Sequence, residues 1–180
     1  MKYQILSLLF ILGLSTTAKA DVEKNINIGF ASYALTIAYG DAFIGDDDYS
    51  GAGISVLYAM SNTFALRGTY YSMEHDDLPE LENTGYDFVA YWGSGFTKEG
   101  FKAYAGGGFF TEDQEIFGFS DSFSGLQLNG GIGYNWSVIS LDLTLGIRDP
   151  SDYEDFIQQN LGISVSAVAV STSLILSARF

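Results

Sequence analysis

The sequence contains no cysteine and only 2 prolines in 180 residues, so no disulfide can hold this chain together. Basic residues are also few: 8 Lys and Arg stand against 22 Asp and Glu, a formal net charge of −14. That balance argues against nucleic acid, and against docking onto anionic lipid through basic residues. After residue 20 no apolar run reaches the roughly 20 residues that a membrane-spanning helix needs. With 47% hydrophobic and 16% aromatic residues, the chain is not disordered either.

The first twenty residues, MKYQILSLLFILGLSTTAKA, are typical of a cleaved secretory signal. Lys2 supplies a short positive region, residues 5–14 are mostly apolar, and Ala18 and Ala20 are the small residues that precede a cleavage site. We expect cleavage between Ala20 and Asp21, which leaves 160 residues with six basic side chains and a net charge of about −16. The expected organisation is a signal peptide over residues 1–20 and a single domain over residues 21–180.

The segment VISLDLTLGIR shows the clearest pattern in the chain. Every second residue of the segment is apolar, and these residues share one face: Ile139, Leu141, Leu143, Leu145 and Ile147. Asp142 and Arg148 lie on the other face, whereas a helix would bring both into an apolar stripe. Ten alternating residues are about the length of a tilted β-strand that crosses a bilayer. The segment is therefore predicted to be a membrane-spanning strand.

Eight segments share this alternation, and we predict strands over residues 25–39, 51–60, 63–74, 85–96, 101–110, 125–136, 138–148 and 165–180. Two of them fit less well. In 25–39 the apolar phase switches, and a bulge near Ala31 and Ser32 is the simplest repair. Before the last strand the residues Leu161, Ile163, Val165 and Ala167 are out of phase. We expect these to form an extension of the strand above the membrane.

The connections alternate between short and long. One to four residues join every second pair of strands, whereas the other four connections cover about 40–50, 75–85, 111–124 and 149–160. In an up-and-down meander all long connections therefore lie at one end of the barrel, the loop end, and the short ones at the other, the turn end. The long connections contain no Lys or Arg. They contain or adjoin 17 acidic residues: Asp41, Asp46, Asp47, Asp48, Glu74, Asp76, Asp77, Glu80, Glu82, Glu112, Asp113, Glu115, Asp121, Asp149, Asp152, Glu154 and Asp155. The basic residues Lys24, Lys98, Lys102 and Arg179 fall near the turn end.

Alternation alone does not say which face points inward. The less apolar face is rich in Gly, Ser, Thr, Asn, Gln and Tyr but has few charges, whereas a water-exposed sheet would carry many. We therefore expect the apolar faces to contact lipid and the barrel to close, because an unpaired strand edge is not stable in lipid. Four charges then lie in the lumen as a balanced network. Arg67 with Asp142 is expected near the turn end, and Asp87 with Arg148 near the loop end.

Side chains are expected to fill the interior of an eight-stranded barrel. The predicted inward residues are Tyr71, Tyr91, Tyr104, Phe110, Gln127 and Asn129, while Gly106, Gly108, Gly131 and Gly133 leave some local room. Aromatic belts are expected at both membrane surfaces. The turn-end belt comprises Phe64, Phe101, Trp136 and Phe180, and the loop-end belt comprises Tyr39, Tyr70, Tyr86 and Phe109.

The chain ends in SLILSARF, with Leu174, Leu176, Ala178 and Phe180 at alternate positions. Together with the signal peptide and the eight alternating segments, this ending resembles the small bacterial outer-membrane barrels: the OmpA transmembrane domain, the OmpX/Ail type and the opacity type. The resemblance implies an all-β, antiparallel, up-and-down, eight-stranded transmembrane β-barrel in the outer membrane of a Gram-negative cell. It also implies contact with outer-membrane lipid and lipopolysaccharide, and recognition of the terminal residues by the barrel-assembly machinery.

The function that the sequence favours is a non-enzymatic barrel with acidic extracellular loops, in a structural or surface-interaction role. A lipid A-modifying or other barrel enzyme and a small-solute channel are the alternatives. His75 is the single histidine, and beside Asp76 and Asp77, with Ser72 nearby, it is interpreted as a solvated loop residue and not as a catalytic base. No cofactor is expected apart from loosely bound Ca²⁺ or Mg²⁺. The weak candidate ligands are Asp46, Asp47, Asp48, Asp152, Glu154 and Asp155.

The terminal aromatic residue gives the first testable prediction. We expect Phe180→Ala to lower the amount of folded barrel in the outer membrane several-fold, because it removes the recognition signal of the last strand. The unfolding free energy of barrels that are already inserted should change little. Heat-modifiable gel mobility of membrane fractions measures the first quantity, and urea unfolding in vesicles measures the second. Normal yield of the variant at high expression would contradict this role for the terminus.

Overall fold

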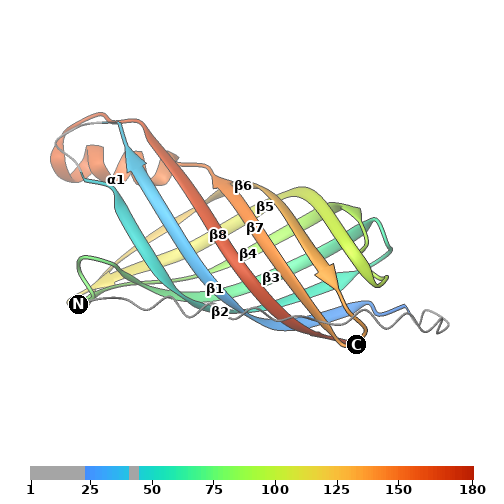
Figure 1. The fold of residues 1–180 in the computed structure, drawn as a ribbon. Coiled ribbons are helices and arrows are strands. Elements are labelled where there is room, and N and C mark those ends of the chain that lie inside the picture. The colour runs from blue at the N-terminus through green and yellow to red at the C-terminus, as the bar shows by residue number, and fades with distance from the viewer. Residues whose placement is uncertain (1–22, 41–44) are drawn as a thin grey trace, which may run out of the picture.

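The computed structural model describes residues 23–40 and 45–180 and forms a closed antiparallel barrel (Figure 1). The predicted signal peptide, its cleavage site at Ala20 and Asp21, and Asp41 lie outside the described residues. The strands are β1 (Ile26–Tyr39), β2 (Asp47–Ala59), β3 (Phe64–His75), β4 (Leu81–Ser94), β5 (Gly100–Ile116), β6 (Phe119–Asn135), β7 (Ile139–Arg148) and β8 (Ala167–Arg179). One helix, α1 (Ser151–Leu161), lies between β7 and β8.

Each strand pairs with its neighbours in the sequence, and β8 closes the barrel by pairing with β1 from Asn27↔Arg179 to Tyr39↔Ala167. The predicted eight-stranded up-and-down architecture is confirmed. The apolar faces point outward, as expected, and leave exposed side chains on every strand, such as Phe30, Trp92 and Leu128. Within the part of the chain that the structure describes, no helix has the length and apolar character to cross a bilayer.

The bulge predicted near Ala31 and Ser32 is wrong. The pairing of β1 with both neighbours runs through these residues without interruption. The apolar residues after the phase switch, including Leu35 and Ile37, therefore point into the lumen, where Ile37 is 0% exposed. The switch in phase marks a change in the lumen from polar to apolar toward the loop end, and it needs no change in backbone pairing.

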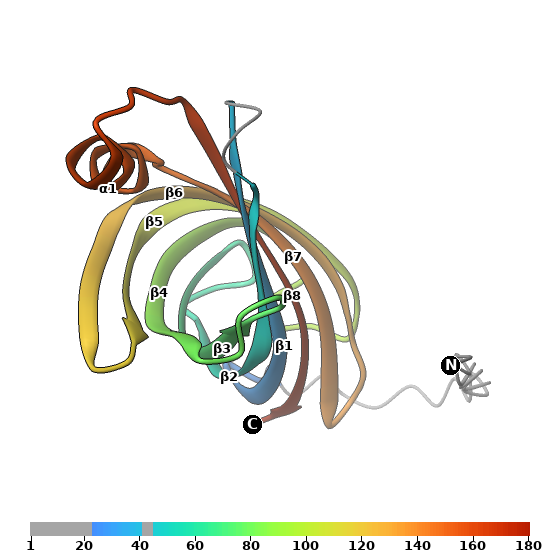
Figure 2. The same cartoon turned by 90° about the vertical axis from the view of Figure 1, so that its left-hand side faces the viewer.

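The predicted loop over 111–124 is also wrong, because most of it is strand. β5 and β6 continue to pair beyond the rim as far as Ile116↔Phe119, and only Phe117 and Gly118 form the turn. The resulting hairpin projects from the loop end (Figure 2). The sequence did not reveal these strand segments. Both of their faces lie outside the membrane, so hydropathy does not alternate strongly along them.

The strand extension predicted over residues 161–167 is wrong as well. Residues 151–161 form α1, and strand pairing resumes only at Ala167. Pro150 precedes the helix, Asp152 and Glu154 lie in its first turn, and Gly162 ends it with φ of 69°. The spacing of Tyr153 and Ile157, which are its buried residues, is that of one helical face.

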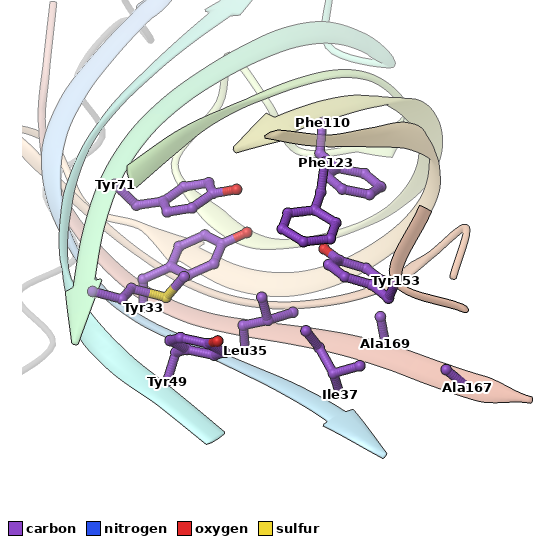
Figure 3. Packing of buried hydrophobic residues seen from close by; sticks show 11 residues of the cluster. Tyr33, Leu35, Ile37, Tyr49, Tyr71, Phe110, Phe123, Tyr153, Ala167 and Ala169 are labelled. Atoms are coloured by element: carbon purple, nitrogen blue, oxygen red, sulfur yellow. The ribbon is translucent and has the colours of Figure 1, made fainter. Parts of the chain in front are cut away.

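Packed side chains close both ends of the lumen. At the loop end an apolar cluster joins α1 to the barrel wall, and Figure 3 shows Tyr153 pointing from the helix toward Phe123 and Phe110. At the turn end Phe96 is buried in a second cluster that includes Tyr91 and Tyr104. The chain end lies at this turn end, opposite α1 (Figure 1).

Most of the predicted belt residues face outward, and aromatic rings meet there across strands. Tyr70 and Tyr86 have ring centroids 5.0 Å apart near the loop end, while Phe64 and Trp92 are 5.8 Å apart near the turn end. Tyr39 is the exception. Without a bulge it lies on the lumen side of β1, where its hydroxyl donates to Asp47 at 3.1 Å.

The uninterrupted register of β1 predicts which isoleucines support the barrel from inside. Ile37→Ala should lower the free energy of unfolding by about 2–5 kcal/mol, because it leaves a cavity in the packed loop end of the lumen. Ile28→Ala is the matched control, since Ile28 is exposed on the outer face of the same strand and lipid can fill the space left. Urea unfolding in vesicles compares the two. Equal losses would contradict the inward orientation of Ile37.

Candidate functional site

Among the described residues, six buried charged side chains are arranged in two layers in the lumen. A seventh, Arg179, is buried at the turn end, where it donates to backbone carbonyl oxygens. The layer near the turn end has Arg67, Lys102 and Asp142, and the layer near the loop end has Asp87, Glu112 and Arg148. Within these two layers three positive charges balance three negative ones. Each layer alone is unbalanced, so the two layers carry excess charges of opposite sign.

Asp142 is the centre of the layer near the turn end. Its carboxylate lies 3.2 Å from the Arg67 guanidinium and 2.8 Å from Nζ of Lys102. The Tyr104 hydroxyl donates to it at 2.6 Å and accepts from Arg67 at 3.1 Å. Lys102, which is 0% exposed, also donates to Ser140 at 2.7 Å. These contacts satisfy a carboxylate that would otherwise be costly to bury.

Arg148 is the centre of the layer near the loop end. It lies 2.6 Å from Glu112 and 3.0 Å from Asp87. It also donates to the hydroxyls of Tyr33 and Tyr71, at 2.9 Å each. Tyr33 in turn donates to Asp87, and Tyr71 donates to Glu112 at 2.9 Å. One guanidinium therefore links β7 to four residues on β1, β3, β4 and β5.

The helix α1 is joined to this layer through Tyr153. Its hydroxyl donates to Oε1 of Glu112 at 2.7 Å, while Oε2 of Glu112 accepts from Arg148 at 2.6 Å. Burial and the nearby Glu112 carboxylate raise the pKa of the Tyr153 hydroxyl well above its usual range, so it remains a donor. The loop-end connection is thereby fixed to the lumen charges.

Two glycines on β6 make room for this network. A Cβ atom on Gly131 would lie 2.5 Å from the Tyr104 ring, and one on Gly133 would lie 2.7 Å from Cε of Lys102. The room predicted at these glycines is thus taken up by side chains. Between the two layers there is a small cavity of about 10 Å³, lined in part by Arg67, Asp87 and Ser173, which is space for about one water molecule.

The structure brings together both predicted pairs, Arg67 with Asp142 and Asp87 with Arg148. Lys102 and Glu112 were not predicted to lie in the lumen. Both have the same inward phase on β5 as Tyr104 and Phe110, so the alternation of that strand could have identified them. The predicted inward residues Tyr71, Tyr91, Tyr104, Phe110 and Gln127 are buried, and Asn129 is half-buried.

The candidate metal ligands do not come together. Asp48 accepts from Thr36, Asp152 accepts from the backbone N–H of Ser124, and Glu154 accepts from that of Ala167. Asp47 lies beside Tyr39, while Asp46 and Asp155 are exposed. Over residues 23–40 and 45–180 no three His, Cys, Asp or Glu side chains are grouped as a metal site.

His75 is not the solvated residue that the sequence suggested, since it is 7% exposed. Its Nδ1 accepts from the backbone N–H groups of Asp77 and Leu78 at 3.2 Å each, and its Nε2 lies 3.4 Å from Asp47. Ser72 is exposed on the opposite face of β3. The geometry therefore does not bring this serine to the histidine as a nucleophile and base.

The unequal roles of the charges near the turn end give a prediction. Asp142→Asn should lower the free energy of unfolding by about 3–5 kcal/mol, because it leaves Arg67 and Lys102 buried without a countercharge. Lys102→Met should cost only about 1 kcal/mol or less, since Arg67 and Asp142 still form a balanced pair. The double variant should be more stable than Asp142→Asn alone. Urea unfolding of the three variants in vesicles tests this, and additive losses would contradict it.

Comparison with known proteins gives matches at the level of structure. No family model matches the sequence, and no curated protein sequence is significantly similar to it. The fold is similar to Ail, the attachment invasion locus protein of Yersinia pestis, with a TM-score of 0.58 and 15% identity over 88% of this chain and 100% of that one. It is also similar to Neisserial surface protein A, with a TM-score of 0.59 and 12% identity over 86% of this chain and 97% of that one.

The N-terminal barrel domain of Pseudomonas aeruginosa OprF has the same fold, with a TM-score of 0.54 and 12% identity over 88% of this chain and 100% of that one. At such low identity these likenesses concern the fold. They agree with the physical features of this chain: a closed barrel, an apolar exterior and a polar, charge-paired interior. The chain has the fold of the small eight-stranded β-barrels of the bacterial outer membrane.

Proposed function

We propose that this barrel is a non-enzymatic surface protein that interacts with other molecules through its acidic loop end. The main support for the proposal is the filled lumen, in which the cavity between two layers of paired charges has space for only about one water molecule. A solute has no open route through such an interior, which argues against the channel alternative. The surface available for recognition is then the loop end, where binding residues are commonly placed on a rigid scaffold.

The charge of the loop end indicates the class of partner. Exposed carboxylates such as Asp76, Asp77, Asp113 and Asp121 come from the β3–β4 connection and from residues 111–124 of the β5–β6 hairpin, and neither segment contains Lys or Arg. A field of one sign attracts cationic partners and raises their association rate. One Ail structure contains sucrose octasulfate, a heparin analogue. We propose that the present chain does not share that class of polyanionic ligand, because its loop end would repel it.

The surrounding membrane supplies further partners. The loop-end carboxylates would face the phosphates of lipopolysaccharide, and loosely bound Ca²⁺ or Mg²⁺ between the two would reduce their repulsion. No cluster of the described residues is built to hold such an ion tightly. The outward Leu174, Leu176, Ala178 and Phe180 on the closing strand support recognition by the barrel-assembly machinery.

The enzyme alternative has less support. Ser72 and His75 lie on opposite faces of β3. Nδ1 of His75, the nitrogen that would act as a general base, accepts from two backbone N–H groups. We therefore propose that His75 holds the β3–β4 connection in place. An unchanged lipid A mass profile in cells with His75→Ala agrees with this assignment.

The proposed role is tested by binding of a cationic probe. Poly-L-lysine should bind the protein in nanodiscs at low salt, and Asp76→Asn, Asp77→Asn, Asp113→Asn and Asp121→Asn combined should weaken that binding about tenfold. Millimolar Ca²⁺ should compete with the probe. Surface plasmon resonance measures all three effects.

The matched control carries Glu23→Gln and Glu99→Gln, two exposed carboxylates away from the long connections. It should bind the probe as the unmodified protein does. If the two sets of substitutions weakened binding equally, the interaction would depend on net charge alone, and the proposal of a loop-end site would be wrong.

A further inference from the structure

The turn at the tip of the β5–β6 hairpin contains an unfavourable residue. Phe117 has φ of 51° and Gly118 has φ of 82°, so both central residues of this two-residue turn are left-handed. Such a turn favours Asn-Gly, because an asparagine tolerates the left-handed region and a bulky aromatic residue does so poorly. Phe117 therefore strains the turn, and strain of this kind points to a role for the side chain.

Phe117 and Phe119 are the exposed aromatic pair of this tip. Their side chains are 81% and 77% exposed. Eight residues separate Phe117 from Phe109 in the loop-end belt, which places the tip about 20 Å beyond that membrane surface for a tilted strand. The tip is thus too far from the membrane that holds the barrel to enter its hydrocarbon layer.

We propose that Phe117 and Phe119 anchor the hairpin in the interface of an apposed lipid bilayer that has no net negative charge. Aromatic side chains are favoured at the boundary between headgroups and hydrocarbon. The proposal rests on the surface-interaction role given above and assigns a lipid surface as the partner of this one element.

Two properties of the tip favour a lipid partner over a folded protein. A stable protein interface buries about 800 Å² on each partner, which two side chains at a turn do not provide. A bilayer interface needs no complementary shape, because lipids adjust around the inserted rings.

The charge of the hairpin selects the kind of bilayer. Asp113, Glu115 and Asp121 lie within four residues of Phe117, and no Lys or Arg occurs between Lys102 and Arg148. Anionic headgroups would repel these carboxylates. A zwitterionic surface such as phosphatidylcholine would not, so the apolar contact of the two rings can determine binding there.

The test measures partition of the protein, held in nanodiscs, onto phosphatidylcholine vesicles by flotation. The double variant Phe117→Asn, Phe119→Ser should partition about tenfold less than the unmodified protein. Phe117→Asn creates the favoured Asn-Gly turn and keeps the hairpin folded, so the loss reports the missing rings. Vesicles with one-third phosphatidylglycerol should take up the unmodified protein less well than pure phosphatidylcholine.

Leu78→Ser is the matched control, since Leu78 is an exposed apolar residue of another loop-end connection. It should partition like the unmodified protein. The proposal is overturned if the double variant partitions like the unmodified protein, or if the unmodified protein partitions no better than empty nanodiscs. Binding to protease-sensitive sites on cells without binding to vesicles would assign the tip to a protein partner and also overturn it.

The two proposals fail in different ways. The variant with four neutralised aspartates should lose poly-L-lysine binding and keep binding to phosphatidylcholine vesicles. The aromatic double variant should lose binding to phosphatidylcholine vesicles and keep binding to poly-L-lysine.

Discussion

The hydrogen-bonding requirement of the backbone in lipid is the constraint on which this structure depends. A strand in a bilayer has no water to satisfy its N–H and C=O groups, so the sheet is stable there only if its first and last strands pair. β1 and β8 meet that requirement over thirteen residues of β1, from Asn27 to Tyr39. Once the sheet is closed, alternate side chains must face either lipid or a narrow lumen. The apolar exterior and the charged interior are two consequences of this one closure.

Closure also explains the chemistry of the lumen. A barrel of eight strands is too narrow to remain full of water, so its polar side chains must satisfy one another. Arg148 and Asp142 do this with several partners each, and the tyrosines Tyr33, Tyr71 and Tyr104 connect the charges as donors and acceptors. Tyr153 extends the same network to α1 and so gives the loop end a fixed position. An interior filled in this way supports the proposal that recognition takes place at the surface of the barrel.

The loop end combines two different surfaces. Its exposed carboxylates form a field of one sign, while the tip of the β5–β6 hairpin carries two exposed aromatic rings at a strained turn. The first favours cationic partners at long range, and the second favours an apolar environment at contact. In the roles that we propose, their combination favours uncharged or basic surfaces and disfavours polyanions.

Alternation along the chain was enough to predict the eight strands, the outward faces and the charges Arg67, Asp87, Asp142 and Arg148, because period two depends only on the strand geometry of each segment. The sequence by itself also indicated a difference between the two ends through the acidity of one set of segments. The predicted lengths of the connections did not hold, since β3–β4 and β4–β5 are joined by five residues each and β5–β6 by two. The tertiary structure decided which side chains lie close to one another in the lumen. It showed that Leu35 and Ile37 point inward, where residues of other strands make that part of the lumen apolar. It showed α1 and the long β5–β6 hairpin, which lie outside the membrane and lack the two-sided environment that produces alternation. The contact of Lys102 with Asp142 likewise depends on the register of neighbouring strands. Both residues are opposite Gly133 of β6, which has no side chain to separate them on the lumen face.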